Sequence, residues 1–516
     1  MTRQTFLQGA FILMIAGMIT RFLGFLNRLV MARLMGEEGV GLYMMVIPSL
    51  FLIMTLTQVG LPVAISKRVA EANAKNDKEE IKKIIRLSCF IIGLTSIIFT
   101  STLFLFSSFI TTRLLTDPRT IYPLLAMLPM IPFIAFSSVI KGYFQGMHNM
   151  KPQSYALIIE QVVRVILVIF FVRIFLPYGV QFAAAAAMLS VFFGELSSFL
   201  YLYTKFKGNK LFTVRTKMFA TIKRSKQTMK SLFSIALPST GSRLINSISS
   251  FIEPILVTQS LAIAGVSTLL ITKQYGELMG YVLPLLFLPT FITNSLSIAI
   301  VPAISDAEAV NNRSETIKRI QQTIRISLAS GAIATVTLTK YATPILTYIY
   351  GSSNGSPFLT LMAPFFILLY IQTPMQASLQ ALDLAQLAMW NSFIGNIVKL
   401  TIIFMLGSHP NFQMNGVVIG MIVGVLLITI LHYVTLKKTI QFFMKVNDIM
   451  QLALLLVLTW FASTFTYNLY VRNETFISLS ISLLILFIIY IVLLFLLNII
   501  SRKELKQIPI IKDWFN

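Results

Sequence analysis

Long apolar stretches, separated by short polar breaks, follow one another from end to end of the chain. Each is long enough for a helix to cross a hydrocarbon core of roughly 30 Å, which takes about 20 residues. The pattern predicts an all-α polytopic membrane protein with about 14 transmembrane helices. The expected spans are residues 6–34, 39–66, 83–109, 120–147, 152–175, 178–204, 231–258, 275–304, 317–341, 357–382, 386–407, 414–436, 449–470 and 476–500.

The composition leaves little room for a soluble domain. Hydrophobic residues make up 56% of the 516-residue chain and charged residues 12%, whereas soluble domains have roughly 45–50% and 25%. The single cysteine, Cys89, allows no internal disulfide, and the three histidines are scattered. We therefore expect no metal site and no cofactor. Hydrophobicity continues past Arg21, so an uncleaved first span is expected rather than a signal peptide.

The distribution of charge indicates membrane topology. A formal net charge of +23 would suit a nucleic-acid-binding protein if the basic residues lay on one surface. They gather instead in alternate connections, among them Lys67 to Arg86, Lys205 to Lys230 and Arg313 to Arg325. This is the positive-inside pattern. It argues against a nucleic-acid partner and predicts a multi-pass cell-membrane protein with both termini cytoplasmic.

An internal repeat organises the spans. Residues 128–164 match residues 363–399 at a constant offset of 235 positions, which pairs Arg164 with Lys399. Because the repeat contains six spans, both copies have the same orientation, which predicts two parallel six-helix lobes with a cavity between them. The predicted parts are an N-lobe over 1–205 with spans one to six, a basic cytoplasmic linker over 206–230, a C-lobe over 231–438 with spans seven to twelve, and residues 439–516 with spans thirteen and fourteen and a cytoplasmic tail.

The first span carries two arginines on one face. Gly17, Arg21, Gly24 and Arg28 are spaced by four, three and four residues, so they share one side of a helix. An arginine inside a span costs roughly 2.5–3.5 kcal/mol, so this face is not expected to point into lipid. A cavity is the favoured environment for Arg21. For Arg28, a cavity and an extended side chain that reaches the membrane interface remain open alternatives.

The seventh span repeats the feature. Its Arg243 follows a serine as Arg21 follows a threonine, and Asn246 and Glu253 continue the polar side of the helix. Arginines at the head of both lobes predict a shared cationic chamber, where a low dielectric strengthens attraction to an anion. We therefore expect these residues to bind substrate.

Further charges lie inside the spans. Glu160 and Arg164 are one turn apart and could form a local ion pair or contact the substrate. The repeat places Lys399 at the position of Arg164 but Gly395 at that of Glu160, which favours a net positive interior. The remaining acids in or near spans are Glu195, Glu277 and Asp383. They are candidates for coupling or gating, and equally for helix-end charges or ion-pair partners.

Several phrases together resemble a known superfamily. They are residues 20–25 (TRFLGF), 36–43 (GEEGVGLY), 61–66 (LPVAIS), 141–146 (KGYFQG), 272–278 (TKQYGEL) and 350–353 (YGSS). Across almost the whole chain the sequence is similar to MviN/MurJ-type lipid II flippases and polysaccharide exporters of the multidrug/oligosaccharidyl-lipid/polysaccharide (MOP) superfamily, in particular to its sporulation members.

The resemblance implies a transporter and no catalytic residues. A V-shaped cavity would open alternately to each side and move an undecaprenyl-pyrophosphate-linked sugar precursor outward, for peptidoglycan of the spore cortex. The implied partners are this lipid-linked oligosaccharide, membrane lipids and cell-wall synthesis proteins. Arg21 and Arg243 match cavity arginines of the family flippases. The second first-helix arginine of those flippases would align near Asn27, one residue before Arg28.

Three alternative functions make different demands on the sequence. A cation-coupled drug antiporter of the same superfamily would need an acidic, aromatic cavity, against which Arg21 and Arg243 argue. A membrane-embedded glycan ligase or polymerase would need a catalytic cluster on an outer loop, and the predicted outer connections are short. A non-transporting scaffold for cortex assembly remains open, because turnover leaves no mark in a sequence.

Overall fold

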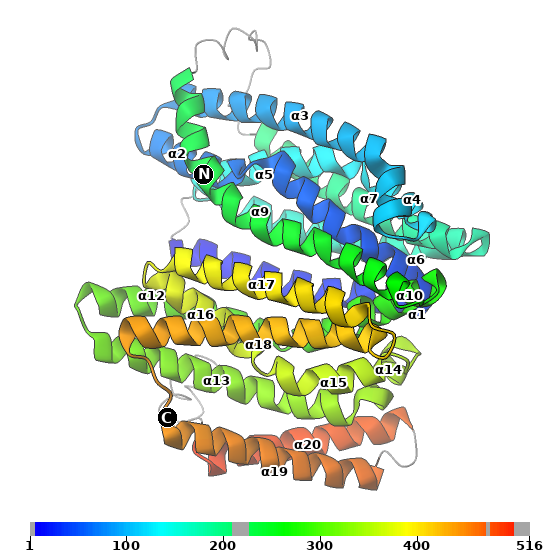
Figure 1. The fold of residues 1–516 in the computed structure, drawn as a ribbon. Helices are drawn as coiled ribbons and strands as arrows, with labels where there is room; N and C mark the ends of the chain where they lie inside the picture. Colours follow the sequence, from blue (N-terminus) through cyan, green and yellow to red (C-terminus); the bar gives the residue numbers. More distant parts are fainter. Residues whose placement is uncertain (1–5, 209–225, 471–474, 500–516) are drawn as a thin grey trace. The chain divides into compact units, whose positions relative to one another are not determined.

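The computed structural model describes residues 6–208, 226–470 and 475–499 (Figure 1). Over these residues all regular structure is helical. Most of the predicted basic linker, 209–225, lies outside the described residues, as do both ends of the chain. Internal packing divides the chain into two compact units, Met1–Gly280 and Tyr281–Asn516, called unit 1 and unit 2 below. The lobes expected from the repeat stay a prediction.

Unit 1 contains nine α-helices among its described residues. They are α1 (Phe6–Gln58), α2 (Leu61–Ala74), α3 (Lys78–Phe109), α4 (Ile121–Met127), α5 (Met130–Gly146), α6 (Lys151–Phe175), α7 (Val180–Lys207), α9 (Lys226–Ile263) and α10 (Thr268–Gly276). Short helices η1 (Ile110–Leu114), η2 (Pro118–Thr120) and η3 (Leu176–Tyr178) connect them, and η4 (Glu277–Val282) follows α10.

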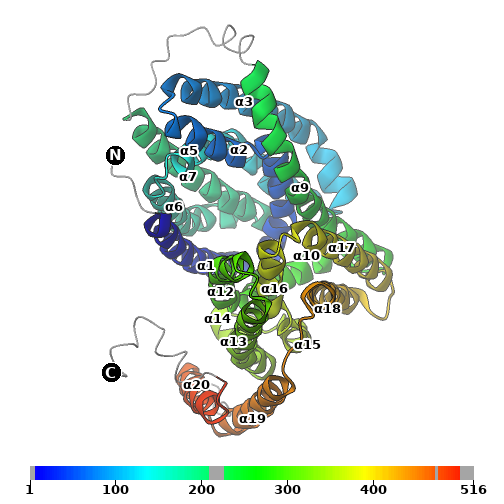
Figure 2. The same ribbon diagram turned by 90° about the vertical axis from the view of Figure 1, so that its left-hand side faces the viewer.

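Unit 2 contains ten α-helices among its described residues. They are α11 (Leu283–Phe287), α12 (Thr290–Ala309), α13 (Arg313–Lys340), α14 (Ala342–Tyr350), α15 (Ser356–Phe366), α16 (Leu369–Ala381), α17 (Ala385–Gly407), α18 (Gln413–Ile440), α19 (Val446–Tyr470) and α20 (Phe476–Leu496). In both views α19 and α20, the predicted spans thirteen and fourteen, lie side by side (Figures 1 and 2).

The structure confirms a helical polytopic membrane protein. Ten of the described helices are long and apolar enough to span a membrane, or eleven if the bent pair α15 and α16 is one span. The count of fourteen stays a prediction. One reason for the difference is that the first two expected spans are counted together within α1, although the backbone at Gly36 between them is non-helical (φ 67°) and kinks the chain there. Glycine reaches that conformation without strain.

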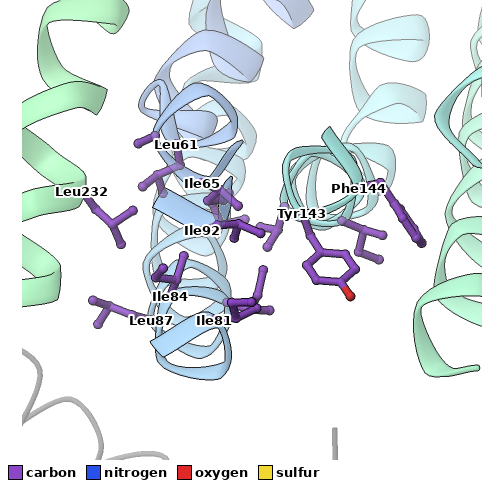
Figure 3. Close-up of a cluster of buried hydrophobic side chains, with 14 of the residues drawn as sticks. Leu61, Ile65, Ile81, Ile84, Leu87, Ile92, Tyr143, Phe144 and Leu232 are labelled. Atoms are coloured by element: carbon purple, nitrogen blue, oxygen red, sulfur yellow. The ribbon is translucent and has the colours of Figure 1, made fainter. Parts of the chain in front are cut away.

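A buried apolar cluster holds α2, α3, α5 and α9 together (Figure 3). Leu61 and Ile65 come from α2, Ile84 from α3, Tyr143 from α5 and Leu232 from α9, and all are at most 2% exposed. Dispersion and close packing among such side chains stabilise a membrane protein, since lipid is as apolar as they are. The cluster fixes the start of α9, which carries Arg243 further along.

Helices α6 and α7 approach each other closely at Gly194. A Cβ atom there would lie 2.8 Å from the carbonyl oxygen of Glu160 and 3.4 Å from the Cβ of Arg164. Small residues permit such backbone contact between transmembrane helices. Gly194 therefore sets the spacing of the two helices at the level of their charged residues.

We expect Gly194→Ala to lower the free energy of unfolding by about 1–3 kcal/mol, because the added methyl group forces α7 away from α6. Thermal unfolding of the purified protein in detergent measures this. Gly208→Ala is the matched control, since its added Cβ meets only Thr204 and Lys205 carbonyl oxygens at 3.5 and 3.7 Å. Equal losses for the two variants would contradict the assigned contact.

A polar cluster ties α10 to the turn that follows η1. The buried Asp117 carboxylate accepts hydrogen bonds from Thr272 Oγ1 at 2.8 Å and from Arg119 Nε at 3.0 Å. Arg119 also pairs with Glu38 on α1. Burial raises the pKa of Asp117, but the hydrogen bonds from Arg119 and Thr272 outweigh burial and hold the pKa below its usual range.

This lowered pKa predicts an acid-sensitive contribution to stability. Asp117 stabilises the fold fully above its unfolded pKa of about 3.9, and the contribution is lost as the pH falls through the lower folded value. Thermal unfolding of the wild type should therefore fall more steeply below about pH 4 than that of Asp117→Asn. Parallel curves for the two proteins would show that Asp117 is not the group responsible.

Tyr341 holds α19 and α20 against α13 in unit 2. Its buried hydroxyl lies 2.7 Å from Thr466 Oγ1 and 2.7 Å from Ser482 Oγ. Lys340 adds cation–π contacts to Trp460 and Tyr467, at 5.7 and 5.6 Å from the ring centroids. The two last helices, which lie outside the sequence repeat, are thus bound to unit 2 by specific contacts.

Candidate functional site

The predicted arginine face of α1 runs along α6 in unit 1. Arg21 and Arg28 are both exposed. Between them, a Cβ on Gly24 would lie 3.9 Å from the amide oxygen of Gln161 on α6. That oxygen is buried and has no hydrogen-bond partner. The face therefore presents one guanidinium group on each side of Gly24, where α1 lies close to α6.

Arg28 belongs to the same group of charges as Arg164. The buried Tyr43 ring lies within electrostatic range of both arginines. Asn27, at the position where the family resemblance places a second arginine, is 6% exposed and donates to Met31 Sδ at 3.4 Å. Asn27 is therefore buried, whereas the side chain of the adjacent Arg28 is exposed.

Glu160 and Arg164 form a close ion pair on α6, with Oε1 2.5 Å from Nη2. Glu160 is 8% exposed and Arg164 is half-buried. The pair neutralises the carboxylate, yet the Nε of Arg164 is buried without a hydrogen-bond partner. One donor of the guanidinium is thus unused in the pair.

A pocket of about 360 Å³ lies between the second half of α1 and α9, inside unit 1. Arg243 and Asn246, two of the residues expected to bind substrate, are among its lining residues. Its other lining residues are Phe51, Met54, Thr55, Gln58, Gly60, Thr240, Ser247 and Ser250. The Thr55 and Ser247 hydroxyl oxygens are 2.7 Å apart and connect the two helices across the pocket.

The pocket has an apolar part, which includes Phe51 and Met54, and a polar, cationic part. It combines one guanidinium with two carboxamides and several hydroxyl groups, and no acid is among its lining residues. Such a set binds phosphate oxygens through the arginine and sugar hydroxyls through the amides. Among the described residues, no group of three or more His, Cys, Asp or Glu side chains could hold a metal ion.

The remaining predicted residues lie elsewhere. Glu253 is half-buried further along α9, within electrostatic range of Tyr275. Glu277 is buried at the start of η4, against the carboxyl of Glu37 on α1. Asp383 is exposed in the turn between α16 and α17, with a left-handed backbone at φ 59°.

Lys399 belongs to unit 2 and is described within it. Its stem packs against α18, where a Cβ on Gly424 would lie 2.9 Å from the Cβ of Lys399. One turn and two turns earlier on α17, Gly395 and Asn391 face the same helix, and the Asn391 amide donates to Thr435 at 2.9 Å. Lys399 therefore belongs to a polar seam between α17 and α18.

Sequence patterns missed several polar residues of unit 1. Thr55 and Gln58 enter the pocket from α1, which only tertiary packing determines. Lys141, on α5, lies 3.9 Å from Glu195 on α7. A lysine inside the predicted span 120–147 was the available signal for this contact, because a charge in a span needs a partner.

Comparisons with known proteins agree with this architecture. The chain is 46% identical to Stage V sporulation protein B of Bacillus subtilis (strain 168) over 512 residues, which cover 99% of each chain. The structure resembles that of lipid II flippase MurJ in an inward closed conformation, with TM-score 0.70 and 14% identity over 98% of this chain and 99% of that one.

A multidrug transporter of the MATE family, solved in an inward-facing conformation, gives TM-score 0.65 at 16% identity, over 82% of this chain and 94% of that one. At such identities the two solved structures establish the fold alone. Residues 6–308 match the family model described as polysaccharide biosynthesis protein. The chain therefore belongs to the polysaccharide biosynthesis protein family.

Proposed function

We propose that the protein translocates a lipid-linked precursor, a sugar carried on undecaprenyl pyrophosphate, across the membrane by alternating access. The observation that carries the proposal is the pocket of unit 1, where Arg243 stands among amides and hydroxyls with no acid in the lining. The planar guanidinium fork of arginine matches phosphate oxygens in pairs. The amides of Gln58 and Asn246 are suited to sugar hydroxyls.

The arginine face of α1 supports the same substrate. Arg21 and Arg28 are exposed on one side of a helix whose other side is apolar. A pyrophosphate that leaves water needs positive charge in a low dielectric, where the attraction is strongest. The prenyl chain needs no site of this kind, because it can stay in lipid. The arginines would thus bind the charged headgroup, and the apolar tail would stay in contact with lipid.

The relatives suggest a role for the transported precursor. Stage V sporulation protein B takes its name from sporulation, and the solved MurJ structure carries lipid II in its name. We extend both properties to this chain as part of the proposal, with peptidoglycan of the spore cortex as the destination. Transport by this chain would be outward from the cytoplasmic leaflet.

The resemblance in fold to a multidrug transporter does not favour a cationic drug as substrate. A cation entering the pocket would meet the guanidinium of Arg243 and no carboxylate in the lining. Like charges in a water-poor cavity repel strongly. An anionic lipid headgroup is the better match to this surface.

Reconstitution into liposomes tests the proposed function. Fluorescent lipid II is placed in both leaflets, and a membrane-impermeant quencher then reports how much crosses in protein-containing and empty liposomes. The proposal expects protein-dependent movement of lipid II and little movement of a neutral glycolipid with the same label. Equal movement of both lipids, or none above the empty liposomes, would refute a lipid-linked pyrophosphate as substrate. The second of these results would favour the scaffold alternative.

A further inference from the structure

A buried carboxyl group in the middle of α7 has no use in the substrate sites described above. Glu195 is the sixteenth of the 28 residues of this helix and is 5% exposed. Its Oε1 atom is buried and has no hydrogen-bond partner. The nearest cation, Lys141 Nζ on α5, is 3.9 Å away. An ionisable group in mid-span with an unused buried oxygen marks a functional site.

The charged groups around Glu195 come from two neighbouring helices. Helix α5 contributes Lys141, and α6 contributes Glu160 and Arg164. Helix α4 contains no charged residue, and Arg28 on α1 lies within electrostatic range of Tyr43. The close approach of α7 to α6 at Gly194 places Glu195 next in sequence to the contact with Glu160.

The two ion pairs of this cluster differ in quality. Glu160 is 2.5 Å from Arg164, within charge-assisted hydrogen-bond distance. The 3.9 Å between Glu195 and Lys141 is too long for a hydrogen bond. Leaving a carboxylate oxygen unsatisfied in a low dielectric is costly, and that cost falls if the oxygen takes up a proton.

A proton fits the site better than a metal ion or an anion does. Lys141 and Arg164 would repel a metal cation, and the two carboxylates would repel an anion. The hydroxyl of Ser137 adjoins Glu195: it can donate a hydrogen bond to the ionised carboxylate and can equally accept one from the protonated carboxyl. A proton on Oε1 would therefore neutralise the carboxyl and still allow a hydrogen bond with Ser137.

We propose that Glu195 is an exchangeable proton-binding site that couples proton uptake to binding of the anionic substrate. A proton from the aqueous phase forms an O–H bond at Oε1 and leaves the carboxyl neutral. Lys141, Arg164, Glu160 and Glu195 then change from two positive and two negative charges to a net charge of +1. That extra positive charge lies beside Arg164 and strengthens the attraction of this cluster for pyrophosphate.

The coupling is reciprocal. If protonation of Glu195 favours binding of an anion, binding of the anion must favour protonation to the same extent. Loss of the proton restores neutrality and weakens the hold on the substrate. The part of this inference that concerns coupling rests on the proposed function, whereas the proton site itself does not.

Infrared spectroscopy of the purified full-length protein tests the site without any substrate. As the pH is lowered across the neutral range, the wild type should gain a carboxylic-acid band that Glu195→Gln lacks. Glu195→Asp keeps a carboxyl and should keep a band, which guards against loss of folding in the amide variant. Glu79→Gln, at an exposed position on α3, is the matched control and should leave the band unchanged.

Two results would overturn the proton site: a band that persists in Glu195→Gln, or one that disappears in Glu160→Gln and not in Glu195→Gln.

A second measurement tests the coupling. Adding undecaprenyl pyrophosphate to weakly buffered protein should cause proton uptake by the wild type and none by Glu195→Gln. If the band belongs to Glu195 but this lipid does not bind, the proposed function fails and the proton site stands. If lipid II is transported but the band is unaffected by Glu195→Gln, the proton site fails and the proposed function stands.

Discussion

Replacing Arg21 and Arg243 together by alanine is expected to lower transport of labelled lipid II by about a hundredfold or more. A hydrogen bond to a charged group contributes roughly 1.5–3 kcal/mol, which corresponds to about a 10- to 150-fold loss for each arginine. Both side chains are exposed on unit 1, so their removal leaves no buried charge without a partner. The loss should therefore appear in transport and not in thermal stability.

Two further variants sharpen this prediction. Arg21→Lys combined with Arg243→Lys keeps the charge and removes the planar fork, so transport should recover only in part. Arg173→Ala removes an exposed arginine at the end of α6, away from the pocket, and should transport as the wild type does. Wild-type transport by the double alanine variant would exclude both arginines from the substrate path.

Arg164→Ala is expected to destabilise the protein by about 3–5 kcal/mol, because it leaves the buried Glu160 carboxylate without its partner. The double variant Glu160→Gln plus Arg164→Gln should lose much less, since neutral amides replace both charges. Denaturant or thermal unfolding in detergent measures the three proteins. The surface pair Glu79 and Lys82 is the control, and breaking it should cost less than about 1 kcal/mol.

The double variant also distinguishes the two roles that the sequence leaves open for Arg164, a local ion pair and contact with the substrate. If Arg164 serves only to neutralise Glu160, the double variant should transport lipid II normally once its stability is restored. If Arg164 also contacts pyrophosphate through its unused Nε, transport should stay low. Equal losses of stability in Arg164→Ala and in the double variant would contradict the ion pair itself.

Much of the fold was predictable from the sequence because it depends on local patterns. The expected spans 152–175 and 178–204 correspond to α6 and α7 within three residues, since Pro152 begins one and Gly179 precedes the other. The break expected between the spans 6–34 and 39–66 coincides with Gly36, where the backbone is non-helical and the chain kinks. The interruption at Val59 and Gly60, inside the expected span 39–66, was not predicted, because it lies within a continuous apolar run.

The site was predictable only along single helices. The spacing of Arg21 and Arg28, and of Glu160 and Arg164, follows from helix periodicity. Contacts between helices do not follow from periodicity, because tertiary packing alone brings the partners together. Examples are Gln161 beside Gly24, Thr55 beside Ser247 and Lys141 beside Glu195. A charge in a span indicates that a partner exists, but not which helix supplies it.

The most direct measurement is competition for binding to the purified protein. Labelled lipid II is bound in detergent and displaced by undecaprenyl pyrophosphate or by undecaprenol, which share the prenyl chain and differ in the charged headgroup. If the cationic surfaces of unit 1 hold the pyrophosphate, undecaprenyl pyrophosphate should compete at least about tenfold better than undecaprenol, and Arg21→Ala plus Arg243→Ala should abolish the difference. Equal competition by the two lipids with the wild-type protein would contradict recognition through these arginines.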